Sequence, residues 1–246
     1  MLGSGEAGFT LLELIVVVAL IAVLVAAVSP SIFQRIAEDR VTDTQAEARA
    51  LHEAMVGDPA SNQFGFVGDI GRLPASFQEL VQRGSLPSYT TSTVREVGMG
   101  WRGPYVNVGT SPDDYLIDAF GRPYTGAPTG QVRSAGPDGV SGNADDIVYP
   151  PAPPVISGTV NVTVKTILKD KTVVDPVGYR VDLFYASNGS QAVLSDTAPP
   201  FSFTDVPMGL HAVRVVKTSN PGAGNVAAED TIVVRPGSAT ALEIWF

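Results

Sequence analysis

The apolar residues of this chain are concentrated in one run near its N-terminus. Every residue from Leu14 to Val28 is apolar, and extending the run back to Phe9 gives 20 residues in which Thr10 and Glu13 are polar. A helix of that length spans about 30 Å, the thickness of the hydrocarbon core of a bilayer. Because backbone groups in lipid must pair within their own segment, we predict a single transmembrane helix here.

After Pro30 the pattern becomes that of an amphipathic helix, which we expect to continue to about Met55. Its apolar positions are Ile32, Ile36, Ala37, Leu51, Ala54 and Met55, and polar residues separate them. Pro30 has no N–H to donate, so we expect it to kink or locally melt the helix. A secretory signal peptide is the alternative, but residues 1–8 contain no Lys or Arg and no cleavage site follows the apolar run.

The middle of the chain, residues 57–149, is rich in turn residues and predicts a small globular region with short strands. Residues 74–83 have the pattern of a short helix that ends at Gly84, and residues 101–106 and 113–126 that of strands between turns. Residues 150–154 read Pro-Pro-Ala-Pro-Pro, which predicts a stiff linker and a domain boundary.

Beyond the linker, residues 155–246 alternate between apolar and polar positions with turns every 8–12 residues, which predicts a small β-sandwich. The expected strands are Ile156–Ile167, Tyr179–Ala186, Phe201–Thr204, His211–Lys217, Glu229–Val234 and Ala239–Phe246. The fold class is therefore α+β, with a long N-terminal helix, a small head containing an antiparallel sheet, and an all-β region.

Charge and composition narrow the function classes. The net charge is −9, which repels phosphate backbones, so we expect no nucleic-acid partner. The absence of Cys excludes disulfides and thiolate metal sites. The sequence contains no G-x-S-x-G, H-E-x-x-H or Walker A motif, and we predict no enzymatic activity.

The sequence around Glu13, GFTLLELIVVVALIAVLV, closely resembles the prepilin motif of type IV pilins and type II secretion pseudopilins. The resemblance implies a leader of residues 1–8, cleavage by the prepilin peptidase between Gly8 and Phe9, and N-methylation of Phe9. It makes Glu13 the fifth mature residue and places Pro30 where many members carry a proline. Family leaders usually carry a basic residue whereas this one has Glu6, so either leader orientation by charge is weak or the start codon lies elsewhere.

Glu13 is expected to act in assembly. A carboxylate in a membrane helix is costly unless it is paired, and cleavage would create a positive amine at Phe9. Glu13 of one subunit can neutralise that amine on a neighbour and so fix the axial register of a filament.

An acidic, glycine-rich loop follows at residues 134–149, with Asp138, Asp145 and Asp146 among small residues. Such loops suit a hard cation such as Ca²⁺, although a solvated turn with Asx-type hydrogen bonds remains the alternative. The loop is not an EF-hand, because its spacing and the residue at the terminal Glu position differ.

The order of three motifs resembles that of the major, G-type pseudopilin over about residues 8–149. The motifs comprise Trp101, Gly103, Pro104 and Tyr105; Asp118, Gly121, Pro123 and Tyr124; and Ser134, Gly136, Asp138, Gly139, Asp145, Asp146 and Ile147. The resemblance implies one Ca²⁺ in the last loop. Its expected ligands are Asp138 and Asp145, with Asp146, Ser141 and backbone carbonyls near Ala135 and Val140. Ala119-Phe120 replaces the usual Pro-Trp of the middle motif.

Residues 201–216 resemble the strand–turn–strand of carboxypeptidase-regulatory-like or immunoglobulin-like modules, which indicates a fold but no ligand. This region is either a spacer or an adhesive or protein-binding module. The resemblances together imply a structural subunit of a type II secretion pseudopilus, which polymerises through its N-terminal helix and supports export across the outer membrane. A type IV pilus subunit, major or minor, is the alternative.

The same resemblances imply the location and partners of the chain. The subunit would be held in the bacterial inner membrane, in contact with lipid, with its head in the periplasm. It would then join a filament in the periplasm or at the cell surface. The implied partners are other copies of the chain, the prepilin peptidase, the inner-membrane assembly platform and minor pseudopilins.

Overall fold

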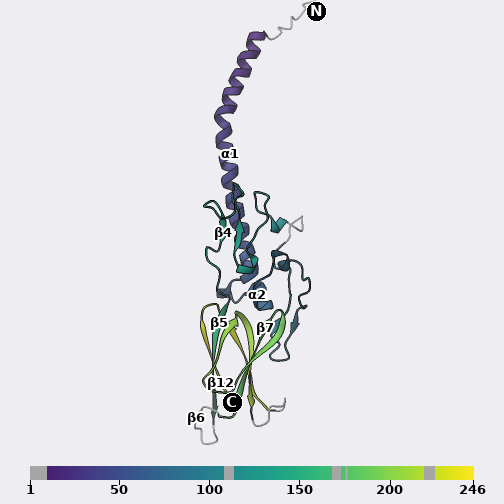
Figure 1. The fold of residues 1–246 in the computed structure, drawn as a ribbon, viewed down its shortest axis with the longest axis vertical. Coiled ribbons are helices and arrows are strands. Elements are labelled where there is room, and N and C mark those ends of the chain that lie inside the picture. Colours follow the sequence, from purple (N-terminus) through teal and green to yellow (C-terminus); the bar gives the residue numbers. More distant parts are fainter. Residues whose placement is uncertain (1–9, 108–113, 168–172, 175–176, 219–224) are drawn as a thin grey trace, which may run out of the picture.

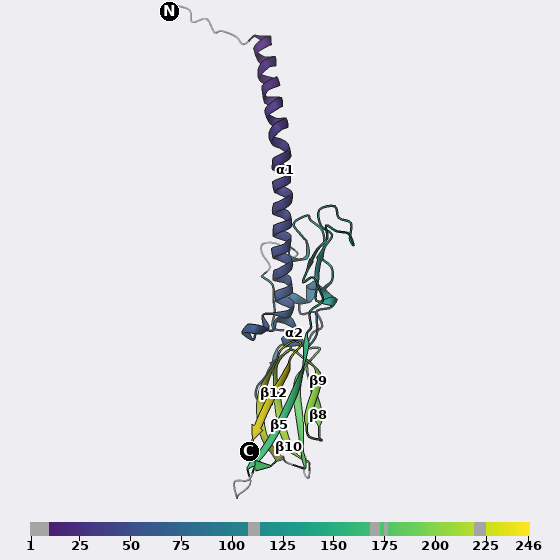
Figure 2. The same cartoon turned by 90° about the vertical axis from the view of Figure 1, so that its left-hand side faces the viewer.

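The computed structural model describes residues 10–107, 114–167, 173–174, 177–218 and 225–246. The molecule is elongated (Figures 1 and 2): a long helix forms one end, a head of loops and short elements surrounds the other half of that helix, and a β-region lies beyond the helix's C-terminal end. This arrangement confirms the predicted α+β class.

Helix α1 runs from Leu11 to Val56, 46 residues, which corresponds to about 70 Å. The Thr10 hydroxyl caps its start by accepting a hydrogen bond from the Glu13 N–H at 3.3 Å. Gly57, with φ +75°, ends the helix and donates its N–H to the Glu53 carbonyl at 2.7 Å. The expected end near Met55 is confirmed, and α1 is assigned as helix through position 30, so the helix is not melted at Pro30.

The C-terminal half of α1 forms the spine of the head. Thr44, Ala48, Leu51 and Met55 are at most 2% exposed and lie along one face at helical spacing. The expected apolar stripe is buried only in this half, because Ile32 and Ile36 are exposed and contact no core.

Apart from α1, the head is built of short helical turns and short strands. Its helical turns are η1 (Pro59–Ser61), α2 (Gly65–Ile70), η2 (Phe77–Leu80), η3 (Asp114–Leu116) and η4 (Ala127–Thr129). Its strands form two antiparallel pairs, β1 (Thr90–Thr91) with β2 (Gly98–Met99) and β3 (Val132–Ser134) with β4 (Ile147–Tyr149).

The expected helix over residues 74–83 is wrong in length, since only the turn η2 forms. Tertiary partners take the groups that a longer helix would use: the Trp101 indole donates to the Glu79 carbonyl at 2.7 Å, and the Tyr105 N–H to the Leu80 carbonyl at 2.7 Å. The strands expected within residues 101–106 and 114–126 are present only as isolated bridges.

The C-terminal region is a pair of packed sheets. Its strands are β5 (Ser157–Ile167), β6 (Val173–Val174), β7 (Tyr179–Ser187), β8 (Ser190–Asp196), β9 (Phe201–Pro207), β10 (Gly209–Lys217), β11 (Val226–Val234) and β12 (Ala239–Trp245). One sheet has the order β11-β10-β7-β8; in the other, β5 lies between β12 and β9 and also pairs with β6. Apolar residues of both sheets, such as Val162 and Val215, form a common core.

The six predicted strands of this region are confirmed to within a few residues, and β6 and β8 are additional strands. The pairing of β12 with β5 is parallel, which the sequence pattern did not indicate.

The head and the β-region share buried surface. Met208, which precedes β10, belongs to the core of the head, and Val94 and Val97 of the head pack on Phe184 and Ala212 of the β-region. The Gly189 N–H donates to the Ile70 carbonyl at 2.8 Å across the same junction.

Candidate functional site

The first half of α1 is an apolar surface without a partner in the described chain. Every side chain from Leu11 to Leu24 is exposed, with Leu11 at 77% and Leu24 at 64%. A soluble protein rarely exposes a continuous apolar surface of this size, so this face marks an interaction surface. No helix is long and apolar enough to cross a membrane among the described residues, and the side chains of residues 25–30 and the whole of Phe9 lie outside them.

Glu13 lies in the first turn of α1, where the helix dipole favours a negative charge. Of the other residues expected to act in processing and assembly, Gly8 and Phe9 lie outside the described residues, and so does the Pro30 side chain. The structure therefore places Glu13 on the apolar surface and does not test its pairing with the amine of Phe9.

The acidic loop, residues 135–146, connects β3 to β4 and is anchored by the middle motif. Asp118, 5% exposed, accepts the Ser134 hydroxyl on one oxygen and the N–H groups of Phe120 and Arg122, both at 2.9 Å, on the other. The Arg122 guanidinium donates to the Gly136 and Pro137 carbonyls. Sequence reasoning noted these motifs but not that they form a clamp on the loop.

The same motif ties the loop to α1. The Tyr124 hydroxyl donates to Glu47 Oε2 at 2.6 Å, and the Ala119 N–H donates to Thr44 Oγ1 at 3.2 Å. Burial, with Glu47 beside it, strongly raises the pKa of Tyr124, so the hydroxyl stays protonated and remains a donor.

Within the loop, donors of the chain itself hold the carboxylates. Asp138 accepts from the Val140 N–H and the Asn143 amide, both at 2.8 Å, and these contacts, the Val140 bond foremost, lower its pKa. Asp145 accepts from the Asp138 N–H at 3.3 Å, and Asp146 Oδ2 from the Gly142 N–H at 2.7 Å.

Asp146 Oδ1 is a buried oxygen of the loop that has no hydrogen-bond partner among the described residues. Ser141 and Val140 are exposed, and the Ala135 carbonyl accepts the Gly139 N–H at 3.1 Å. In the described chain no group of three or more His, Cys, Asp or Glu residues is placed to hold a metal ion. The oxygen donors and the orphaned Asp146 Oδ1 fit the chemistry of Ca²⁺, but the carboxylates do not converge, so calcium binding stays a prediction.

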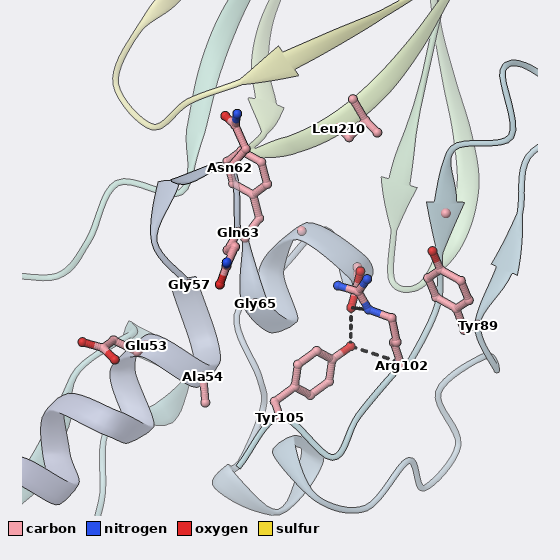
Figure 3. Close-up of a pocket in the computed structure, with 14 residues that line it drawn as sticks. Glu53, Ala54, Gly57, Asn62, Gln63, Gly65, Tyr89, Arg102, Tyr105 and Leu210 are labelled. Carbon is pink, nitrogen blue, oxygen red and sulfur yellow. Dashed lines mark hydrogen bonds and ion pairs between the residues drawn. The ribbon is translucent and has the colours of Figure 1, made fainter. Parts of the chain in front are cut away.

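A second polar site lies at the junction of the head and the β-region (Figure 3). Asp69 on α2 is 7% exposed, and its Oδ2 accepts the Tyr105 hydroxyl at 2.8 Å and Arg102 Nε at 3.1 Å. Sequence reasoning missed it; the available signal was an acidic residue within the apolar segment Phe64–Ile70.

Comparison with known protein families gives a match at the N-terminal end of the chain. Residues 3–29 match the model of the prokaryotic N-terminal methylation motif. The match supports a type IV pilin-like prepilin, with processing by a prepilin peptidase and assembly into a filament. It does not extend to the head or the β-region.

Other comparisons add little. No curated protein matches the chain. Among solved structures, a crystal structure from Pseudomonas aeruginosa described as a "putative carbohydrate binding protein" is similar at 12% identity. The similarity covers 40% of this chain and 94% of that one, with a TM-score of 0.28.

Proposed function

We propose that the chain is a structural subunit of a type II secretion pseudopilus, which polymerises through its N-terminal helix and supports protein export across the outer membrane. The methylation motif carries the proposal because it couples a processing signal to an apolar surface. The exposed apolar stretch Leu11–Leu24 and the buried face between Thr44 and Met55 give α1 one part for assembly and one part for the head.

In this proposal the apolar helix spans the inner membrane before assembly, with the head in the periplasm. After cleavage between Gly8 and Phe9, the helix leaves the bilayer and packs against copies of itself. The apolar surface is then buried by neighbouring helices, which supplies the driving force for polymerisation. The assembly platform and minor pseudopilins would organise this step.

A surface type IV pilus subunit is the second candidate. It is favoured by the β-region, which lies at the opposite end of the molecule from the apolar surface and is available for contacts outside a filament (Figure 2). An adhesive or partner-binding role would then belong to this region. Loss of protein secretion in a deletion strain supports the pseudopilus, and loss of adhesion or twitching supports the pilus.

A bound Ca²⁺ in the acidic loop is a separate proposal, supported by the loop's oxygen donors and by the unpartnered Asp146 Oδ1. Asp138, Asp145 and Asp146 would hold the ion, with Ser141 and the carbonyls of Ala135 and Val140 as further donors. The ion would supply positive charge that fastens the loop to the clamp around Asp118.

The assembly role is tested with Glu13→Ala in the native host. We expect normal membrane insertion and cleavage but at least about tenfold fewer filaments, because an unpaired buried amine costs several kcal/mol in an apolar core. Glu38→Ala is the matched control, since Glu38 is an exposed acidic residue on the same helix. Filament yield is measured by shearing and immunoblotting.

Mass spectrometry of the mature protein checks processing in the same cells. A mature chain that begins with N-methylated Phe9 is the expected result. An intact Met1, or wild-type filament yield from Glu13→Ala, contradicts the proposal.

A further inference from the structure

A cavity of about 540 Å³ lies where the end of α1, helix α2, the segment 98–105 and strand β10 meet (Figure 3). Its volume is within the range of small-molecule sites, roughly 300–1,000 Å³. The side chains that matter for recognition are Asn62, Gln63, Asp69, Tyr89, Arg102 and Leu210. Leu210 comes from the β-region and the others from the head, so the cavity exists only where the two regions meet.

Two large side chains, Tyr89 and Leu210, form the apolar part of the cavity lining. Tyr89 and Leu210 are 43% and 45% exposed, large fractions for such side chains. The Tyr89 ring lies so close to the backbone of Gly98 that a Cβ there would come within 1.8 Å of the hydroxyl oxygen. Glycine at position 98 therefore lets the ring lie against strand β2.

The floor offers unused hydrogen-bonding groups. Asp69 uses Oδ2 for Tyr105 and Arg102, and its Oδ1 accepts no hydrogen bond from the described chain. Arg102 donates through Nε to Asp69, and its two terminal nitrogens donate to no described residue. Gln63, an exposed amide, makes no side-chain hydrogen bond within the described residues either.

Hydrogen bonds hold Asp69, Tyr105 and Arg102 in a fixed arrangement in the floor of the cavity. Burial raises the pKa of Asp69, while the Tyr105 hydroxyl and Arg102 oppose that shift and favour the carboxylate. The Tyr105 hydroxyl, whose own pKa burial raises strongly, stays a donor and fixes the carboxylate. An acceptor oxygen and a donor guanidinium thus lie side by side, and the Arg102 guanidinium carbon lies over the Tyr89 ring at 5.6 Å from its centroid.

We propose that this junction cavity binds an uncharged saccharide. Neighbouring hydroxyls of a sugar ring both donate and accept, so one can donate to Asp69 Oδ1 while the next accepts from the Arg102 guanidinium. The C–H groups of the ring pack against Tyr89 and Leu210. The Gln63 amide and the NH2 group of Asn62, whose Oδ1 accepts from Arg235, add contacts at the edge of the cavity.

Charge and shape disfavour other ligands. An anion would meet the carboxylates of Asp69 and Glu53, and a cation would meet Arg102. The N–H and C=O groups of a trans peptide unit point in opposite directions within its plane, whereas the floor presents acceptor and donor next to each other. The proposal goes beyond the filament function and stands or falls independently of it.

The test uses the full chain in micelles of an alkyldimethylamine oxide detergent, because detergents with sugar headgroups would compete with the saccharide probes for the cavity. Saturation-transfer NMR and calorimetry measure binding of lactose, maltose, cellobiose and chitobiose, with sialic acid, phosphate and a glycine-rich peptide as comparison probes. We expect at least one neutral disaccharide to bind with millimolar affinity or better.

Two variants remove different parts of the site. Arg102→Gln removes the donor, Tyr89→Ala removes the aromatic ring, and each should weaken binding at least about tenfold, or roughly 1.4 kcal/mol. Tyr89→Phe keeps the ring and should bind within about twofold of wild type. Arg95→Gln is the matched control, because Arg95 is an exposed arginine of the head with a distant 4.0 Å ion pair and no place in the cavity.

Arg102→Gln leaves Asp69 without its partner and can destabilise the fold. In that case Tyr89→Ala still tests the proposal. The proposal is overturned if none of the neutral probes binds, or if phosphate, sialic acid or the peptide binds more tightly than all of them. It is also overturned if folded Tyr89→Ala binds a neutral disaccharide as well as the Arg95→Gln control.

Discussion

His211 is a buried imidazole at the start of β10, 1% exposed, next to the junction. Its Nε2 donates to the Pro207 carbonyl at 2.6 Å, and its buried Nδ1 has no partner in the part of the chain that the structure describes. The Tyr185 ring is edge-on at 6.3 Å between centroids. A proton on Nδ1 would be a buried, unsatisfied charge, so the folded protein holds this ring neutral.

The resulting pH dependence can be measured. Burial lowers the pKa of His211 to about 4, whereas the unfolded chain takes up a proton near the ordinary value of 6.5. The neutral His211 ring therefore contributes its full share of stability above pH 6.5. That share is lost as the pH falls toward the pKa of His211 in the folded protein. Between pH 7 and pH 4.5 we expect His211 to account for a loss of about 2–3 kcal/mol.

His211→Gln should remove that part of the decline in urea-unfolding free energy between pH 7 and pH 4.5, whatever its stability at neutral pH. His52→Gln is the matched control: burial also lowers the pKa of His52, but this ring is only half-buried and bonds the Gly130 carbonyl. Equal declines in wild type and His211→Gln would show that the buried ring does not set the acid sensitivity.

At the scale of elements, the conformation of the acidic loop depends on residues that lie outside it in the sequence. Its ends are fixed by the β3–β4 pair and its base by Asp118 and Arg122. The sequence identified the loop and its acidic residues from composition. The clamp depends on contacts 14 to 16 residues apart, which no local pattern encodes.

Calcium should stabilise this loop if the ion binds there. Binding only to the folded state adds about 2.7 kcal/mol at a concentration 100 times Kd, which raises the melting temperature of a chain of this size by roughly 5–10 °C. Differential scanning calorimetry of the full chain in micelles, with millimolar CaCl₂ and then with excess chelator, measures the shift.

Asp145→Asn should abolish the shift, and Asp230→Asn, which changes an acidic residue of β11 far from the loop, should retain it. A melting temperature that does not respond to calcium or chelator would remove the ion from this loop.

Regular elements were the most predictable part of the molecule. Alternation such as Val160, Val162 and Val164, all nearly fully buried, located strand β5. The missed strand β8 is an edge strand whose Val193 faces solvent, but Asn188-Gly189, both at positive φ, is a hairpin signal that the pattern offered. The helix expected over residues 74–83 failed because Trp101 and Tyr105, distant in sequence, take its carbonyls.

At the scale of the whole molecule, the head and the β-region are joined by more than the Pro-rich segment. The Gly189 N–H of the β-region donates to the Ile70 carbonyl of the head at 2.8 Å, and Arg235 of the β-region donates to Asn62 of the head at 2.9 Å. With Met208 in the core of the head, separating the regions would expose apolar surface and break these bonds. The β-region is thus carried as a fixed extension beyond the end of α1.

This packing predicts that the head and the β-region unfold together. Each contains one tryptophan, Trp101 in the head and Trp245 in the β-region, so Trp245→Phe and Trp101→Phe make fluorescence report on one region at a time. We expect coincident urea midpoints for the two reporters, because losing either region exposes the core that both share.

Met208→Ala should lower both urea midpoints equally, because it removes side-chain volume from the shared core. We expect the free energy of unfolding to fall by about 2–4 kcal/mol. Val160→Ala, within the β-region core alone, should also lower both midpoints together, because a defect in one part of a two-state unit destabilises the whole unit. Separate midpoints in the wild-type background, or a Val160→Ala or Met208→Ala shift in one reporter only, would mean that the two regions unfold independently.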